Sequence, residues 1–297
     1  MSKQLIMRVV YDRPEMLQLS IEYEIKAREY HMLPGKFHTL FVIEHGAPQK
    51  IFDLIKEYPF EYSVITRDQK FGLSKNILEG MKSAFEIADD FIIYIEDDIL
   101  IHRTYFKYMY MLLNMKGLGQ YTVLSPYSRK NDGDVHEVYK GNHYCAWSAL
   151  ITKKFFEGYI VHCIGQNYYA DYATRSRFVV ALNNKFKEHW GKKYKYRNDT
   201  HNEQAGLINR LVDIAVIQDD AYVILPRVNR QMHIGLVGKN RPGSLPGNTY
   251  EERLANMRDI IENNRFYEVT QSKMYNDYLV FDEKLNEWDG TLRLKED

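Results

Sequence analysis

Residues 91–98 read Phe-Ile-Ile-Tyr-Ile-Glu-Asp-Asp, a continuous apolar run that ends in three carboxylates. A run of this kind is typical of a strand that is buried on both faces of a sheet. Three further strand patterns precede it, at 5–10, 39–43 and 62–66, and a segment with helical spacing follows each of them. Strands that alternate with helices predict βαβ units. The expected fold is therefore α/β and Rossmann-like, a mostly parallel mixed sheet with helices on both faces.

The composition of the chain changes near residue 250. Residues 1–250 carry the predicted strands and helices and are interpreted as one domain. Within this domain, residues 165–200 are rich in Tyr, Lys and Asn with weak periodicity, so they are interpreted as an insertion. Residues 251–297 are polar, which predicts a C-terminal extension that is partly helical and partly irregular.

The composition also excludes several classes of protein. The 297 residues include 40 Lys and Arg against 40 Asp and Glu, so no net charge attracts the whole chain to a polyanion. Two cysteines supply neither a disulfide framework nor a four-cysteine zinc site, and they indicate a reducing compartment. The nucleotide motifs Gly-x-Gly-x-x-Gly and Gly-x-x-x-x-Gly-Lys-Ser/Thr do not occur, which disfavours a dinucleotide dehydrogenase and a P-loop ATPase. Since no apolar run approaches about 20 residues, we expect a soluble, cytoplasmic protein without a membrane partner.

The acidic triplet Glu96, Asp97 and Asp98 stands at the carboxyl end of the buried strand, which is the edge where open α/β sheets bind ligands. Three adjacent acids repel one another, and a divalent cation such as Mn²⁺ or Mg²⁺ would relieve the repulsion. If the extended backbone continues, Glu96 and Asp98 point to one side and Asp97 to the other. The alternative is a solvated turn that favours the start of the next helix.

Four segments, in order along the chain, carry a family resemblance. They are Val10-Tyr-Asp-Arg13, Ile95-Glu-Asp-Asp-Ile-Leu with the following Tyr105-Phe106, Leu124-Ser125 through Asn131-Asp-Gly133, and Ile224-Leu-Pro-Arg-Val-Asn-Arg230 through Gly238. Together they resemble motifs of N-acetylglucosaminyltransferase I and its relatives, which are GT-A glycosyltransferases. The resemblance spans about residues 5–240. It implies a GT-A domain over 1–250 that transfers a sugar, with inversion, from a nucleoside-diphosphate sugar to an acceptor hydroxyl.

The resemblance also assigns roles to the acidic triplet. It implies that Asp98 binds a divalent metal, Mn²⁺ or Mg²⁺, that Asp97 binds the ribose and that Glu96 binds a hydroxyl of the donor sugar. His233 follows the last predicted strand, where some GT-A enzymes offer a histidine to the metal. A packed, satisfied side chain is the alternative for His233.

A second set of residues would hold the nucleotide of the donor, for which a UDP-sugar is expected. Arg13 would contact the phosphates, and its alternative is a surface ion pair with Asp12. Asn76 falls where the family has a histidine, and Glu44 or His45 where it has an aspartate near the base, so the identity of the nucleotide stays open. The candidate donor-binding residues outside the acidic triplet are thus Tyr11, Asp12, Arg13, Glu44, His45 and Asn76.

Direct displacement requires a general base for the acceptor hydroxyl. The resemblance places it at the start of a late helix, where Glu203 is the first choice. Asp171 and Asp199 are its rivals for this role. The alternative is that Glu203 is the acid of a capping box that begins at Thr200.

The insertion contains one strongly basic stretch, residues 185–197, with interleaved aromatic side chains. Basic groups among aromatics suit phosphate contacts with base stacking, although a solvated surface is the alternative. We expect the acceptor to be a glycan or, because this stretch is basic, a hydroxymethylated base in DNA, as in a phage or bacterial enzyme. Two other functions stay open: a nucleic-acid-binding protein with a degenerate fold, and a nucleotidyltransferase. The candidate acceptor-binding residues are Trp190, Lys192, Lys193, Tyr194, Lys195 and Arg197.

Overall fold

The structure is a computed structural model of the chain. It describes residues 4–30, 37–119, 121–128, 133–141, 147–161, 221–234 and 281–295, together with 212, 215–216, 249, 251–252, 255–257 and 259.

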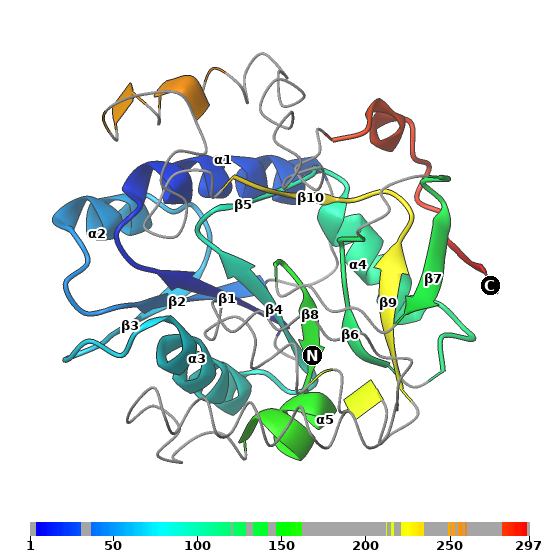
Figure 1. Cartoon of the computed structure of the whole chain (residues 1–297), viewed down its shortest axis with the longest axis horizontal. Coiled ribbons are helices and arrows are strands. Elements are labelled where there is room, and N and C mark those ends of the chain that lie inside the picture. The colour runs from blue at the N-terminus through cyan, green and yellow to red at the C-terminus, as the bar shows by residue number, and fades with distance from the viewer. Residues whose placement is uncertain are drawn as a thin grey trace, which may run out of the picture.

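A mixed sheet of nine strands forms the centre of the described chain (Figure 1). Its strands are β1 (Gln4–Val10), β2 (Phe37–Ile43), β3 (Tyr62–Thr66), β4 (Phe91–Glu96), β6 (Tyr121–Leu124), β7 (Glu137–Gly141), β8 (Leu150–Thr152), β9 (Tyr222–Pro226) and β11 (Arg293–Lys295). They lie in the order β11-β7-β9-β6-β8-β4-β1-β2-β3. Five of the eight ladders are parallel, and the three antiparallel ones join β8 to β4 and β6, and β7 to β9.

The four strands expected from the sequence form one parallel block, β3-β2-β1-β4. The chain moves outward from β1 to β2 and β3 and then returns to place β4 on the other side of β1. The strand order therefore reverses between β1 and β4, the point where open α/β sheets leave a crevice at their carboxyl edge.

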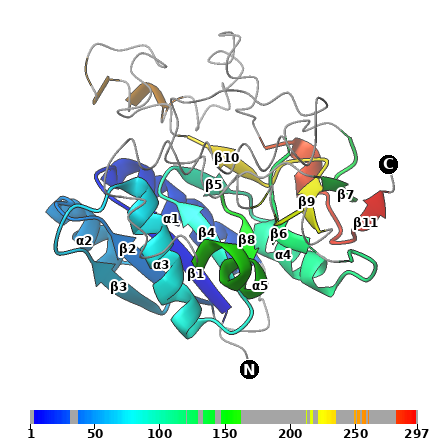
Figure 2. The same ribbon diagram turned by 60° about the horizontal axis from the view of Figure 1, so that its bottom comes forward.

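Helices cover both faces of this block. They are α1 (Pro14–Tyr30), α2 (Gln49–Lys56), α3 (Leu73–Ile87), α4 (Tyr105–Asn114) and the short α5 (Lys153–Phe155), which continues as the π-helix η1 (Phe156–Ile160). Figures 1 and 2 show α3 and α5 on one face of the sheet and α1 on the other. Leu5 and Met7 of β1 pack into the α3 cluster, whereas Ile6 packs with α4, because successive side chains of a strand point to opposite faces. The predicted fold class is confirmed.

A buried network of charges ties α1 to the sheet. Arg8, in the middle of β1, donates to Glu24 of α1 through Nε at 2.7 Å and to Ser20 Oγ at 3.0 Å. Arg28 and the Tyr58 hydroxyl also reach Glu24 Oε1, each at 2.6 Å. Arg8, Ser20 and Glu24 are fully buried. Charges this deep in a core are tolerated only when they are paired and hydrogen-bonded, as they are in this network.

A second, two-stranded sheet lies beside the first. Its antiparallel strands are β5 (Ile99–Ile101) and β10 (Gln231–His233), and the register sets His233 opposite Ile99. This pairing brings two segments that are at least 130 residues apart in sequence to the end of β4.

The C-terminal residues contribute more structure than the sequence predicts. After the 3-10 helix η5 (Glu283–Asn286), residues 293–295 add β11 to the edge of the main sheet, parallel to β7. Leu285 and Trp288 are buried in the cluster that contains α4. The division of the chain near residue 250 stays a prediction. Among the described helices, none has the length and apolarity needed to cross a membrane.

Candidate functional site

Polar residues follow each strand of the parallel block at one edge of the sheet. Because adjacent strands lie about 4.8 Å apart, the row from the end of β4 to the end of β3 is about 14 Å long. The row consists of Asp97 and Asp98 after β4, Tyr11, Asp12 and Arg13 after β1, Glu44 and His45 after β2, and Arg67 after β3.

Arg13 crosses from β1 to the acidic residues of β4. Its Nη1 donates to Asp98 Oδ2 at 2.7 Å, its Nε donates to Asp97 Oδ2 at 3.2 Å, and its Nη2 donates to Asp97 Oδ1. Both aspartates are only 3% exposed, whereas the Arg13 side chain is 26% exposed. The ion pair of Arg13 is therefore with Asp97 and Asp98, and the expected pair with Asp12 is corrected.

The alternation expected for the acidic triplet is also corrected. Strand β4 ends at Glu96, and Asp97 and Asp98 form a turn that leads into β5. A turn does not keep the two-residue repeat of a strand, so the carboxylates of Asp97 and Asp98 face the same guanidinium. The solvated-turn alternative does not hold either, since both aspartates are buried.

His233 lies against Asp98. The Nε2 atom of His233 is 3.2 Å from Asp98 Oδ2, and the backbone N–H of Ile234 donates to the Asp98 carbonyl at 2.8 Å. The other side of the imidazole stacks on Trp147, with ring centroids 4.4 Å apart and planes 15° apart. Trp147 precedes Ser148, a non-glycine residue in the left-handed region with φ of 52°. Strained backbone of this kind clusters at active sites and ligand-binding sites.

The charges of the triplet are unequal. Burial, with the nearby Asp98 charge, raises the pKa of Glu96 to about 8, and the Tyr94 hydroxyl donates to it at 2.9 Å. Burial raises the pKa of Asp97 to about 6 even though Arg13 opposes the rise. Burial alone would also raise the pKa of Asp98, but Arg13 and His233 outweigh burial and hold it well below its usual range. At neutral pH Asp98 is therefore charged, Asp97 is mostly charged and Glu96 is largely protonated.

Asp98 and His233 fit a divalent cation. The Oδ1 atom of Asp98 is buried and has no hydrogen-bond partner among the described residues. Carboxylate oxygen and imidazole nitrogen are ligands that Mn²⁺ accepts, and such ions often bind through one or two protein groups plus substrate phosphates. No cluster of three or more His, Cys, Asp or Glu side chains in the described part of the chain is arranged to hold a metal. The cation would thus depend on phosphate oxygens to complete its shell.

The far end of the row is built around Glu44 and Arg67. The Glu44 carboxylate accepts from the backbone N–H groups of His45, Phe71 and Gly72, so it fixes the loop that precedes α3. Arg67 Nε donates to Asn76 Oδ1 at 2.8 Å. Both Glu44 and Asn76 are buried and internally bonded, so nucleotide contacts by these two side chains stay predictions.

A cationic and aromatic rim borders this end of the row. The guanidinium of Arg67 lies 4.9 Å from the Phe71 ring centroid, and Lys75 Nζ lies 4.0 Å from it. Lys70 Nζ donates to the Tyr11 hydroxyl at 3.2 Å. Arg67 and Phe71 are not among the predicted site residues, although Arg67 directly follows a predicted strand.

Comparisons with known proteins come from solved structures alone. No family model matches the sequence, and no curated protein matches it. The chain is similar to the mannosyltransferase PcManGT from Pyrobaculum calidifontis in complex with GDP-Man and Mn²⁺, at 10% identity and a TM-score of 0.38, over 53% of this chain and 46% of that one. It is also similar to TarS from S. aureus, at 10% identity and a TM-score of 0.45, over 73% and 82%. A third similar structure is 4-diphosphocytidyl-2C-methyl-D-erythritol synthase from Anaerococcus prevotii, at 9% identity and a TM-score of 0.38, over 56% and 78%.

These similarities are weak. The chain spans less than half of the mannosyltransferase and of two other TarS structures, 46%, 29% and 47% of their lengths. Likeness at this level assigns no function. The resemblance to N-acetylglucosaminyltransferase I stays a prediction.

Several predicted site residues lie outside the described part of the chain. They are the candidate bases Glu203, Asp171 and Asp199, and the basic stretch with Trp190, Lys192, Lys193, Tyr194, Lys195 and Arg197. The described residues therefore include those predicted to bind the donor and the metal, but neither the predicted base nor the predicted acceptor-binding residues.

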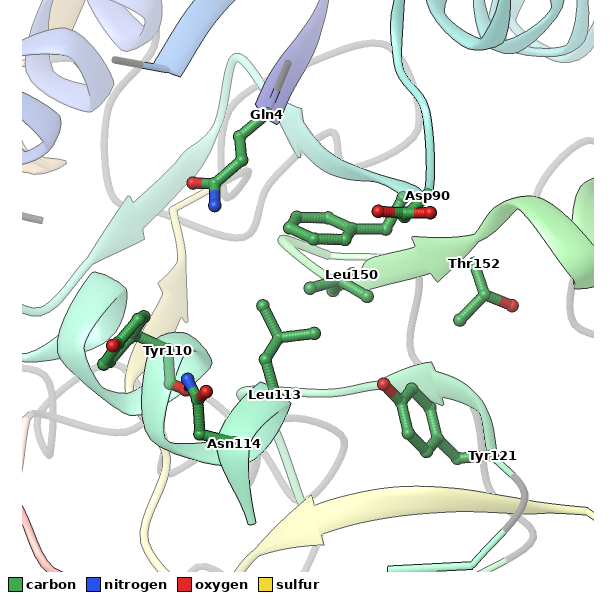
Figure 3. A pocket seen from close by; sticks show the side chains of 9 residues that line it. Gln4, Asp90, Tyr110, Leu113, Asn114, Tyr121, Leu150 and Thr152 are labelled. Carbon is green, nitrogen blue, oxygen red and sulfur yellow. Dashed lines mark hydrogen bonds between the residues drawn. The ribbon is translucent and has the colours of Figure 1, made fainter. Parts of the chain in front are cut away.

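A separate cavity of about 310 Å³ lies at the opposite edge of the sheet (Figure 3). Gln4 and Phe91, the first residues of β1 and β4, line it together with Leu113 and Asn114 of α4. Because ligands of parallel sheets bind at the carboxyl ends of the strands, this cavity is not part of the candidate site.

Proposed function

We propose that the chain is a cation-dependent glycosyltransferase of the GT-A kind, which moves a sugar from a nucleoside-diphosphate sugar to an acceptor hydroxyl. One observation carries the proposal. Where the strand order reverses, the buried acids Asp97 and Asp98 after β4 meet Arg13 after β1, beside His233. Acids for a cation and a guanidinium for phosphate are the groups that a nucleoside diphosphate needs.

The described residues divide the work of donor binding. Asp98 and His233 would hold the cation, which stabilises the negative charge that develops on the departing diphosphate. Arg13 would bind a phosphate, and Asp97 the ribose. Glu96, with its raised pKa, keeps a proton that it can donate to a hydroxyl of the donor sugar. The row toward Arg67 and Phe71 supports a nucleoside at the other end, and a UDP-sugar is the proposed donor.

On the acceptor side, a carboxylate takes the proton of the attacking hydroxyl, and Glu203 or Asp171 is the proposed base. Attack from the side opposite the leaving diphosphate would invert the anomeric carbon. The basic stretch at 185–197 supports an anionic acceptor, such as DNA with a hydroxymethylated base, and a neutral glycan is its alternative.

A thermal-shift panel tests this proposal. Nucleoside diphosphates and their sugars are added with and without Mn²⁺ to the native chain, to Asp98→Asn and to the control Asp53→Asn, which changes an exposed acid of α2. A ligand at 100 times its Kd stabilises by about 2.7 kcal/mol, so at least one nucleotide should raise the Tm in a Mn²⁺-dependent way. The shift should persist in Asp53→Asn and disappear in Asp98→Asn. Comparing ligand-induced shifts rather than absolute Tm values removes the effect of the lost Arg13 contact.

Two results would contradict the proposal. The first is the absence of any nucleotide shift under every metal condition, and steeply salt-dependent binding of nucleic acid by Asp98→Asn would then support a binding protein. The second is release of pyrophosphate during turnover, which would indicate a nucleotidyltransferase.

A further inference from the structure

Arg13 occupies the place where a cation would neutralise the acidic turn. All three guanidinium nitrogens are directed at Asp97 and Asp98, and no other hydrogen bond of its side chain is found among the described residues. Within the described part of the chain, Arg13 pairs with both buried aspartates from the end of β1, and His233 contacts Asp98 from β10. Without a positive charge here, two adjacent carboxylates would repel each other in an environment that screens them poorly.

In this position Arg13 opposes the binding of a divalent cation. Arg13 Nη1 donates to Asp98 Oδ2 at 2.7 Å, and Oδ1 of the same carboxylate, which has no partner among the described residues, is the atom that a cation would bind. Ligand oxygens lie about 2.1 Å from Mg²⁺, so an ion on this carboxylate and the guanidinium would be only a few ångströms apart. Two positive charges at that separation repel. The cation and the present position of Arg13 therefore oppose each other.

We propose that Arg13 and the divalent cation are alternative counter-ions of the Asp97–Asp98 turn. In the ligand-free chain Arg13 holds the turn, and when the cation binds, Arg13 moves to a phosphate of the donor. The side chain has room to move, because it is 26% exposed whereas its two partners are buried. This inference rests on the proposed function and deepens it.

A coupling between ligands follows. Without nucleotide, the positive charge of Arg13 opposes a cation on Asp98, and a guanidinium that moves away finds no phosphate to bind, so cation binding is weak. With nucleotide, a phosphate receives the released guanidinium, so cation and nucleotide strengthen each other's binding by the same factor.

The test measures Mn²⁺ binding by electron paramagnetic resonance of free Mn²⁺, on the full chain, with and without UDP. Arg13→Gln removes the competing charge. In the absence of UDP, Arg13→Gln should bind Mn²⁺ at least tenfold more tightly than the native chain. UDP should tighten Mn²⁺ binding strongly in the native chain and much less in Arg13→Gln. The control Arg293→Gln removes an exposed arginine paired with Asp134 and Glu137, and should behave like the native chain.

The outcomes separate this inference from the proposed function. If Arg13→Gln does not fold, Arg13→Lys, which keeps a charge but lacks the planar fork of donors that contacts both aspartates, should show a smaller gain of the same sign. Equal or weaker Mn²⁺ binding by the folded Arg13 variant without UDP would overturn the inference alone, provided that Asp98→Asn abolishes the binding. No Mn²⁺ binding by any variant, with or without UDP, would overturn the proposed function as well.

Discussion

The protein should unfold far more easily when one charge is removed from the core of the parallel block. The perturbation is Glu24→Gln, which keeps the size of the side chain but loses its charge. Glu24 is fully buried and accepts from Arg8 and Arg28, two guanidiniums within 2.6 Å of its oxygens, and from Tyr58. Burial alone would raise the pKa of Glu24, yet Arg8 and Arg28 hold it below its usual range, so the charged form is the one the fold stabilises.

The expected loss of stability follows from the two arginines that lose their shared partner. Glu24→Gln removes the acid that Arg8 and Arg28 share. In the native structure Arg8 is fully buried and the Arg28 side chain is only 10% exposed, so water does not replace the lost partner. Breaking a buried ion pair on one side costs about 3 to 5 kcal/mol, because the remaining charge stays in the core. Domains are stable by about 5 to 15 kcal/mol, so this variant should lose a large part of its stability.

Urea unfolding followed by circular dichroism measures the loss. With an m-value of about 3 kcal/mol per molar urea, the midpoint should fall by at least about 1 M. Glu29→Gln, an exposed position on the same helix, is the control and should stay within about 0.5 kcal/mol of the native chain. If Glu24→Gln lies within about 1 kcal/mol of that control, the network does not stabilise the fold in the way its geometry indicates.

Two further variants probe the region around the C-terminal segment. Burial, with Arg103 and Arg230 nearby, lowers the pKa of His102 from 6.5 to about 4, so the fold favours the neutral ring. The stability gained from the neutral ring is complete above pH 6.5 and is lost as the pH falls toward 4. His102→Asn removes the titrating ring but can still accept from the Thr104 N–H, so over this range the native chain should lose up to about 3 kcal/mol more stability than the variant. Parallel pH profiles of the two proteins would argue against this prediction. Trp288→Ala should cost about 3 to 5 kcal/mol in urea unfolding, because a buried ring that lies against Arg230 is removed. A loss no larger than that of the exposed control Glu287→Ala would mean that residues 281–295 add little to the domain.

The parallel block could be predicted because its strands and helices differ in periodicity. The apolar run at 91–95 corresponds to β4, and the three earlier predicted strands correspond to β1, β2 and β3. The acids after β4 lie at the edge where open α/β sheets bind ligands. Arg8 was missed because one charge within a strand looks like an outward-facing position. Only the spatial proximity of Glu24 on α1 shows that Arg8 points into the core.

The contacts within the site depend on pairings that local sequence does not encode. Arg13 and Asp98 are 85 residues apart and meet because β1 and β4 are neighbours in the sheet. His233 reaches Asp98 through the short β5–β10 pairing, which has too few residues to leave a periodic signal. Arg67 could have been found, since the rule that pointed to Asp97, a polar residue just after a strand, applies to it equally.

Crystals grown with UDP and MnCl₂ would test the central claim most directly, through the anomalous scattering of manganese. A peak within coordination distance of the Asp98 carboxylate, with the diphosphate on its other side, is the expected result. A nucleotide bound elsewhere, for example in the cavity beside Gln4 and Phe91, with no manganese peak at Asp98, would contradict the proposed cation site at the junction of β1 and β4.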